Sequence, residues 1–171
     1  MPADWVRAQR LMLKHIVVGS MSHAHAYRPE EGERYAVLSF LDIGAESPVF
    51  PRPEGFVERL VVHADDCAPQ DAQSSFDGRA LCPLSERQAQ QIARFIRANA
   101  ERIDTLVVHC HAGISRSPGA ALAIAEALAV SEVEMLNGDR IAPNAHVRNL
   151  VRDALNAMAG TKRSASHSIC G

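Results

Sequence analysis

The chain has 171 residues, 47% of them hydrophobic, and carries a formal net charge of −2 at pH 7. A chain of this length can bury the core of one domain. The nearly neutral charge argues against a nucleic-acid-binding protein, which would show a basic face, and against a polybasic membrane anchor. No apolar run approaches the length of a membrane-spanning helix, and the N-terminal residues lack the apolar stretch of a signal peptide. We therefore expect neither nucleic acid nor a membrane as a partner.

The first part of the chain predicts three strands. Short apolar runs at residues 13–18 and 35–40 are typical of buried strands. The polar segment 19–34 between them is expected to form a loop with room for a helical turn. Three prolines in residues 46–55 predict an irregular segment, and a third strand is expected at residues 59–64.

The second part of the chain predicts helices around one further strand. Ser85 and Gln88 form a capping-box pattern, so a helix is expected to begin there. The apolar residues that follow recur on one helical face: Ala89, Ile92, Ala93, Ile96 and Ala100. Residues 105–109 predict a fourth strand, and the almost wholly apolar segment 117–128 predicts a central buried helix.

The last helix is expected to be capped by Asn144. Its apolar stripe consists of Val147, Leu150, Val151, Leu155 and Met158. The polar tail, residues 161–171, is expected to be disordered. Strands that alternate with helices predict an α/β fold with a central, mostly parallel sheet of about four to five strands flanked by helices.

The cysteines and histidines show no metal-binding pattern. The four cysteines, Cys67, Cys82, Cys110 and Cys170, are scattered without paired spacing. This scatter favours a reducing compartment over a disulfide framework, so we expect a cytoplasmic protein. Spacings such as Cys-x-x-Cys are absent from the sequence, and we expect neither a metal ion nor another cofactor.

The most informative segment joins the fourth strand to the helix that follows it. It reads His109-Cys110-His111-Ala112-Gly113-Ile114-Ser115-Arg116-Ser117. A loop between a strand and a helix N-terminus can cradle an anion, because its backbone N–H groups and the helix dipole favour negative charge. A thiol such as Cys110 loses its proton more easily there. The guanidinium of Arg116 can bind two phosphate oxygens at once.

This segment, extended to Val107-Val108 and Pro118, resembles the His-Cys-x5-Arg-Ser/Thr signature of the cysteine-dependent protein tyrosine phosphatase superfamily. It is most similar to the small bacterial members of the dual-specificity branch. The resemblance covers residues 35–158, and it implies a dual-specificity phosphatase-like fold in a single phosphatase domain, residues 1–160. It also implies hydrolysis of phosphate monoesters through a phosphocysteine intermediate without a metal ion.

The resemblance implies a role for each part of the motif. Cys110 is the nucleophile and Arg116 binds the phosphate, together with the loop residues His111, Ala112, Gly113, Ile114 and Ser115. The Ser117 hydroxyl assists breakdown of the phosphocysteine, and it is also a candidate cap for the following helix. His109 is expected to help lower the pKa of Cys110. Asn144 matches an asparagine that braces the loop in the family.

The general acid has two candidates. Asp66 follows the strand at 59–64, where the family carries this residue, and strand ends position catalytic groups in α/β folds. Its separation from Cys110 is longer than compact family members use, and an insertion around residues 68–81 would account for the excess. Asp77 fits the spacing better but does not follow a strand. We therefore favour Asp66.

The substrate is expected to be a phosphorylated protein or a small phosphate ester. The loop contains no lysine, which argues against inositol lipids with several phosphates, and phosphotyrosine is the default, with phosphoserine and phosphothreonine as further candidates. Two other functions stay open: a phosphate-binding pseudophosphatase and a thiol-dependent arsenate reductase. Cys67 or Cys82 could serve a reductase as the resolving cysteine, or could form a reversible disulfide with Cys110.

Overall fold

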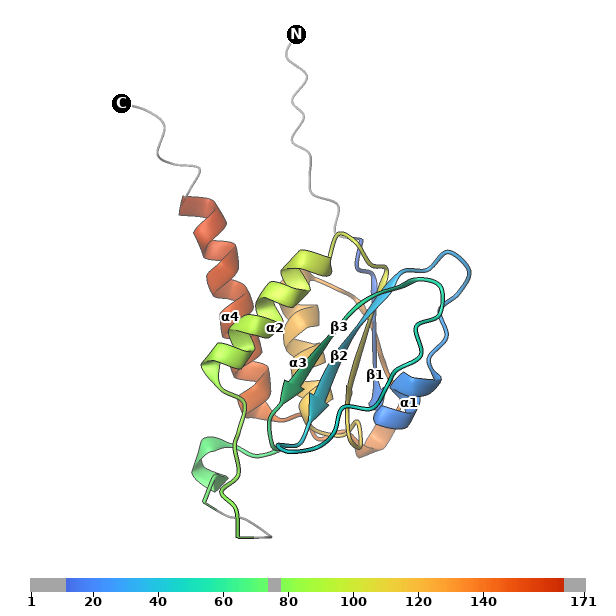
Figure 1. Cartoon of the computed structure of the whole chain (residues 1–171). Coiled ribbons are helices and arrows are strands. Elements are labelled where there is room, and N and C mark those ends of the chain that lie inside the picture. The colour runs from blue at the N-terminus through green and yellow to red at the C-terminus, as the bar shows by residue number, and fades with distance from the viewer. Residues whose placement is uncertain (1–11, 74–77, 165–171) are drawn as a thin grey trace, which may run out of the picture.

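Five parallel strands form the centre of the protein in a computed structural model, which describes residues 12–73 and 78–164, the last four by backbone alone (Figure 1). In chain order the strands are β1 (His15–Ser20), β2 (Tyr35–Leu41), β3 (Phe56–His63), β4 (Thr105–Cys110) and β5 (Glu132–Met135). They lie in the order β3-β2-β4-β1-β5, and every pair is parallel. The predicted α/β class is confirmed, and so are the four expected strands, each with shifted ends.

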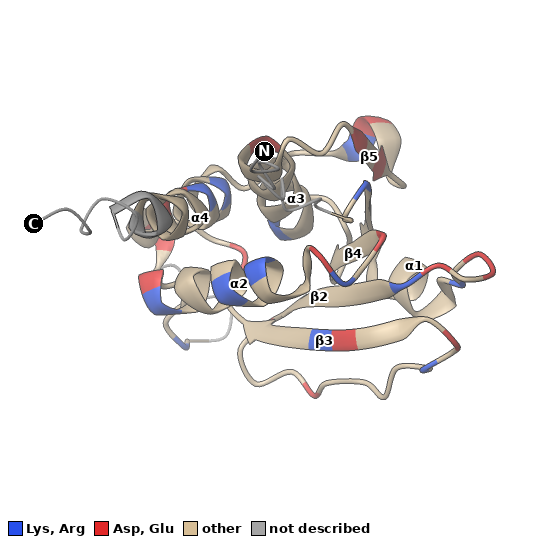
Figure 2. Cartoon of the chain, turned by 90° about the horizontal axis from the view of Figure 1, so that it is seen from above, with Lys and Arg blue, Asp and Glu red and all other residues tan. Residues whose placement is uncertain are grey.

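Three helices pack together on one side of this sheet (Figure 2). They are α2 (Glu86–Asn99), α3 (Arg116–Leu128) and α4 (Ala145–Ser164). The short helix α1 (Met21–Ala26) lies in the segment expected to be a loop, and two 3-10 turns occur at Pro69–Asp71 and Gly138–Arg140. β5 occupies a sheet edge beside β1, and its alternating exposed glutamates gave no apolar run to indicate it.

The buried residues divide by face because side chains alternate along a strand. Ile16, Leu38 and Val108 belong to the large core between the sheet and α2, α3 and α4. Val37 and Val107 face the other way, into a smaller cluster with residues from α1 and from the irregular segment after β2. Both faces of β2 and β4 are therefore covered, which fits their fully buried sequences.

The helix starts largely follow the predicted capping. The Ser85 hydroxyl accepts a bond from the Gln88 N–H at 3.2 Å, and Gln88 Oε1 accepts one from the Ser85 N–H at 3.0 Å. Asn144 Oδ1 accepts from the Val147 N–H at 3.0 Å, as expected of a cap of α4. The expectation that Ser117 caps its helix is wrong, because α3 already begins at Arg116.

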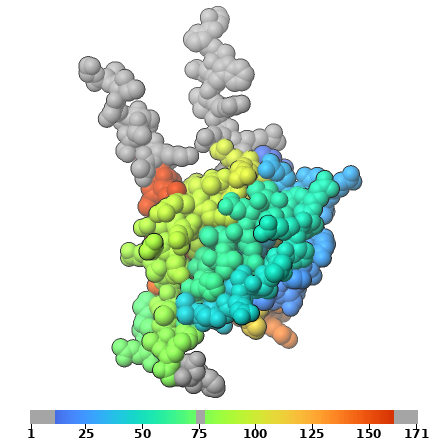
Figure 3. Space-filling view, viewed as in Figure 1, coloured from blue at the N-terminus to red at the C-terminus, as the bar shows by residue number. Residues whose placement is uncertain are grey.

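The last helix is longer than expected, and the segment before α2 lies outside the main body of the fold. α4 extends to Ser164, four residues into the tail expected to be disordered, and the remaining residues 165–171 lie outside the described part. Residues 64–73 and 78–85, between β3 and α2, project from the carboxyl end of the sheet (Figures 1 and 3). Among residues 12–73 and 78–164, no helix is long and apolar enough to cross a membrane.

Candidate active site

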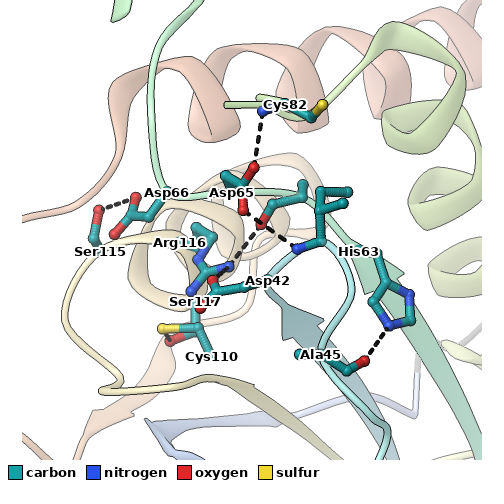
Figure 4. Close-up of polar contacts among 12 residues, drawn as sticks. Asp42, Ala45, His63, Asp65, Asp66, Cys82, Cys110, Ser115, Arg116 and Ser117 are labelled. Atoms are coloured by element: carbon teal, nitrogen blue, oxygen red, sulfur yellow. Dashed lines mark hydrogen bonds and ion pairs between the residues drawn. The ribbon is translucent and has the colours of Figure 1, made fainter. Parts of the chain in front are cut away.

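The predicted site residues gather at the carboxyl ends of the central strands (Figure 4). Residues 110–117 leave β4 and enter α3, while β2 and β1 flank β4 on either side. Because the strands are parallel, the segments that follow β1, β2 and β3 meet this loop at the same edge. The site therefore combines one local motif with side chains from distant parts of the sequence.

The loop after β4 is folded against the junction of β1 and α1. Gly113 has a φ of +72°, and a Cβ atom at this position would collide with the backbone of Gly19 and Ser20. The Met21 N–H donates to the His111 carbonyl at 3.2 Å, which joins the first turn of α1 to the loop. The motif therefore needs glycine at position 113 for both its conformation and its packing.

The thiol of Cys110 lies inside the curve of this loop. The Gly113 N–H donates to its Sγ atom at 3.2 Å, and the Ser117 hydroxyl also lies 3.2 Å from it. Cys110 is buried, and burial acts to raise the pKa of its thiol. The hydrogen bonds from Ser117 and Gly113 and the positive charge of Arg116 outweigh burial, so the pKa of Cys110 lies below its ordinary value.

Arg116 is buried at the bottom of the site. Its Nη1 atom donates to the Ala64 carbonyl at 2.6 Å and lies 2.7 Å from the Asp42 carboxylate. Its Nε atom is also buried, yet it has no hydrogen-bond partner among the described residues. A buried charged donor without a partner is costly. An anion bound in the loop could supply the missing acceptor.

Asp66 lies at the rim of the loop, as expected for the candidate acid. Its Oδ1 atom accepts hydrogen bonds from the Ser115 hydroxyl at 2.7 Å and from Asn144 Nδ2 at 2.9 Å. Among the described residues, no donor reaches Oδ2, and the residue is exposed. The other candidate, Asp77, falls outside the described residues.

Its neighbour Asp65 points away from the loop (Figure 4). The Asp65 carboxylate accepts two bonds from Arg79, at 2.7 and 3.0 Å, and further bonds from the N–H groups of Cys82 and Ile43. The hydrogen bonds from Arg79 contribute most to a pKa of about 2 for Asp65. Asp65 therefore ties together the segments that follow β2 and β3.

His109 does not act on Cys110 as expected. Its ring is buried, with Nε2 at 2.7 Å from Ser39 Oγ and Nδ1 at 3.3 Å from the Cys110 carbonyl oxygen. Burial lowers the pKa of His109 to about 4, so the ring is neutral at pH 7 and supplies no positive charge to the thiol. The expectation that His109 lowers the thiol pKa is wrong. Its ring instead holds the backbone of the loop to β2.

The tautomer of His109 follows from its neighbours. Arg59 Nε donates to the Ser39 oxygen at 2.8 Å, which leaves the Ser39 hydroxyl hydrogen for His109 Nε2. The remaining ring proton then lies on Nδ1, where it can be donated to the Cys110 carbonyl. A chain of three polar side chains thus reaches from β3 through β2 to the start of the loop.

Two residues of the site escaped the sequence analysis. Asn137 Nδ2 donates to the carbonyls of Ala112 and Gly113, at 2.6 and 3.2 Å, and so braces the loop from the side of β5. Asn144, expected in this role, instead contacts Asp66, while its backbone N–H donates to the Ser115 carbonyl. Asp42 was also missed, although its place directly after β2 was a usable signal.

The remaining candidates take part in these contacts only through their backbone carbonyls. His111 and Ala112 are exposed at the outside of the loop, and Ile114 is half-buried. Within the described residues the cysteines are free, and no group of three or more metal-binding side chains occurs. No protein-family model matches the chain, and no curated protein matches it either.

Proposed function

We propose that the protein is a metal-independent phosphatase that hydrolyses phosphate monoesters through a phosphocysteine intermediate. The observation that carries the proposal is the buried, unpartnered Nε atom of Arg116 in the same loop as a thiol whose pKa is lowered. The first feature favours an anionic ligand, and the second favours a nucleophile. Together they support phosphoryl transfer to sulfur.

In the first step the Cys110 thiolate attacks the phosphorus atom of the bound ester. An S–P bond forms while the bond from phosphorus to the ester oxygen breaks, and Asp66 donates a proton to the departing oxygen. Arg116 and the N–H groups of the loop stabilise the charge on the three remaining phosphoryl oxygens. The position of Asp66 at the exposed rim supports this role, because the leaving group must depart toward solvent.

In the second step water attacks the phosphocysteine. The Asp66 carboxylate, deprotonated by the first step, takes a proton from this water as its oxygen bonds to phosphorus. The S–P bond breaks, and inorganic phosphate and the Cys110 thiolate are released. The Ser117 hydroxyl at 3.2 Å can donate a hydrogen bond to the sulfur as it regains negative charge.

The most favoured substrate class is protein phosphotyrosine, with phosphoserine and phosphothreonine as further substrates. The absence of lysine from residues 110–117 supports esters of a single phosphate over highly charged ones. A hollow of about 330 Å³, lined by Met21, His25 and Pro48 among others, lies next to α1 and could hold part of a leaving group. A cytoplasmic location belongs to the same proposal, since the nucleophile must stay reduced.

The test is hydrolysis of p-nitrophenyl phosphate by freshly reduced protein in the presence of EDTA. We expect turnover that falls by at least about 10⁴-fold in Cys110→Ser, because a hydroxyl at this position is not ionised at neutral pH. Cys82→Ser is the matched control, since Cys82 is exposed and its side chain lies outside the loop. Loss of activity in both variants, or in neither, would contradict the proposal.

If the wild-type protein hydrolysed no ester, two alternative functions would have to be distinguished. Binding of phosphate without turnover would identify a phosphate-binding module. Thiol-dependent reduction of arsenate that requires Cys67 or Cys82 would identify a reductase.

A further inference from the structure

We propose that Asp42 makes this site selective for phosphate monoesters that carry no second anionic group beside the phosphate. The inference rests on the proposed function and concerns the choice of substrate. Asp42 follows β2 directly, and its carboxylate lies 2.7 Å from Arg116 Nη1. The Asp42 side chain is 55% exposed while that of Arg116 is 5% exposed, so the carboxylate lies between the buried arginine and solvent.

The segment after β2 holds Asp42 in this position. The Ile43 N–H donates to Asp65 at 3.3 Å, and Asp65 is itself fixed by the paired bonds from Arg79. Two residues further on, the Ala45 carbonyl accepts from the His63 ring at 3.1 Å. Figure 4 shows the bond between Ala45 and His63, and Asp42 beside Arg116. The negative charge therefore stays beside the phosphate-binding arginine.

This pairing limits the charge that the site can accept. One side of the guanidinium, at Nη1, is already matched by Asp42, and the free Nε atom can satisfy one phosphate group. A phosphate bound to Nε and a carboxylate bound to Nη1 share one guanidinium, so they lie within about 7 Å of each other. A further anionic group on the substrate would then meet Asp42, and also Asp66 at the rim, with repulsion from both.

Two arginines in the segments around the loop do not remove this repulsion. Arg79 is engaged by Asp65 in a two-bond pair. Arg140 is exposed in the segment whose Ala142 N–H donates to the Ile114 carbonyl, and Asp139 precedes it. A second anionic group is therefore tolerated only if it points toward Arg140.

The test compares two phosphotyrosine peptides that are identical except for the residues on both sides of the phosphotyrosine, glutamine in one and glutamate in the other. For the wild-type protein we expect kcat/KM to be about tenfold higher with the glutamine peptide. In Asp42→Asn this ratio should fall to about threefold or less, and Asp42→Glu should keep it. Salt at about 0.5 M should shrink the wild-type ratio, because it screens exposed charges.

The matched control is Glu101→Gln, which removes the same charge at an exposed position between α2 and β4, at the opposite end of the sheet. Its ratio should equal that of the wild type. A wild-type preference for the glutamate peptide, or an unchanged ratio in Asp42→Asn, would overturn the inference. Cys110-dependent hydrolysis of the glutamine peptide would still support the phosphatase itself.

If no peptide is hydrolysed, the proposed function fails, but the charge limit can still be measured. Calorimetry of the Cys110→Ser protein with phosphate and with pyrophosphate then gives the selectivity directly. Tighter binding of phosphate than of pyrophosphate, with this preference lost when Asp42→Asn is added, would support the inference. Tighter binding of pyrophosphate, or no binding of either anion, would overturn it.

Discussion

The segments that follow β4 and β3 reach the same site in different ways. Residues 110–117 form a short loop whose main contacts with sulfur come from its own members, Gly113 and Ser117. The segment after β3 is much longer, and it brings Asp66 to the loop through bonds to Ser115 and Asn144. The nucleophile is therefore placed by local chain geometry, and the acid by contacts between distant segments.

Apart from the loss already expected for Cys110→Ser, the largest expected effect tests the local segment. Arg116→Lys should lower kcat/KM for p-nitrophenyl phosphate by about 10³-fold, because an ammonium group cannot bind two phosphoryl oxygens as a planar fork does. Steady-state kinetics check this, with circular dichroism to confirm folding. Arg148→Lys is the control, since Arg148 pairs with Glu126 on the protein surface. A loss below tenfold in Arg116→Lys would mean that the loop does not bind phosphate as described.

The next effect tests the distant segment through its two neighbouring aspartates. Asp66→Asn should lower kcat by about 10²-fold for esters with poor leaving groups, which need a proton, and much less for p-nitrophenyl phosphate. Asp65→Asn should change kcat less than Asp66→Asn does, because Asp65 points away from the loop. The measurement is kcat across aryl phosphates of differing leaving-group pKa. If Asp77→Asn lost the most activity with poor leaving groups, the acid would be Asp77.

The smallest effect concerns stability. The hydrogen bonds from Arg79 lower the pKa of Asp65 from 3.8 to about 2, so the folded state favours the ionised carboxylate. This contribution is fully present above pH 4 and is lost as the pH falls toward 2, and it amounts to about 2 kcal/mol. Urea unfolding at pH 7 should show Asp65→Asn less stable by about this amount, with the difference narrowing below pH 4. If the difference in unfolding free energy were undiminished at about pH 2.5, the Asp65–Arg79 pair would be excluded as its cause.

Activity and stability should respond differently in the two segments. A substitution in residues 110–117 should lower activity while the fold stays intact, since these residues bind the reacting group. A substitution in the segment after β3 should also lower the free energy of unfolding, because Asp65 holds the segments after β2 and β3 together. A stability loss in Arg116→Lys larger than in Asp65→Asn would reverse that distinction.

Much of the fold could be predicted because it depends on local patterns. The capping box at Ser85 and the cap at Asn144 need only residues three positions apart. The buried strands appear as apolar runs, and among the strands in the described residues only β5, with two exposed glutamates, left no such run. The helix α1 escaped prediction because it is six residues long and polar.

The site itself could be predicted only in part. Cys110, Gly113 and Arg116 follow from one continuous motif, and Asp66 from its place after a strand. The role given to His109 failed because charge depends on burial, and burial beside Ser39 and Phe50 is a property of the folded core. The Asn137 brace had no signal, since asparagine in a turn is ordinary.

The chemistry of the nucleophile thus depends on nine consecutive residues, 109–117, because backbone N–H groups and a helix N-terminus act at short range. The surroundings of that chemistry were decided by the order of strands. β2 lies beside β4 although about 70 residues separate Ser39 from its partner His109, and this pairing brings Asp42 to Arg116. Such pairing depends on which faces can be buried together, and no local pattern carries that information.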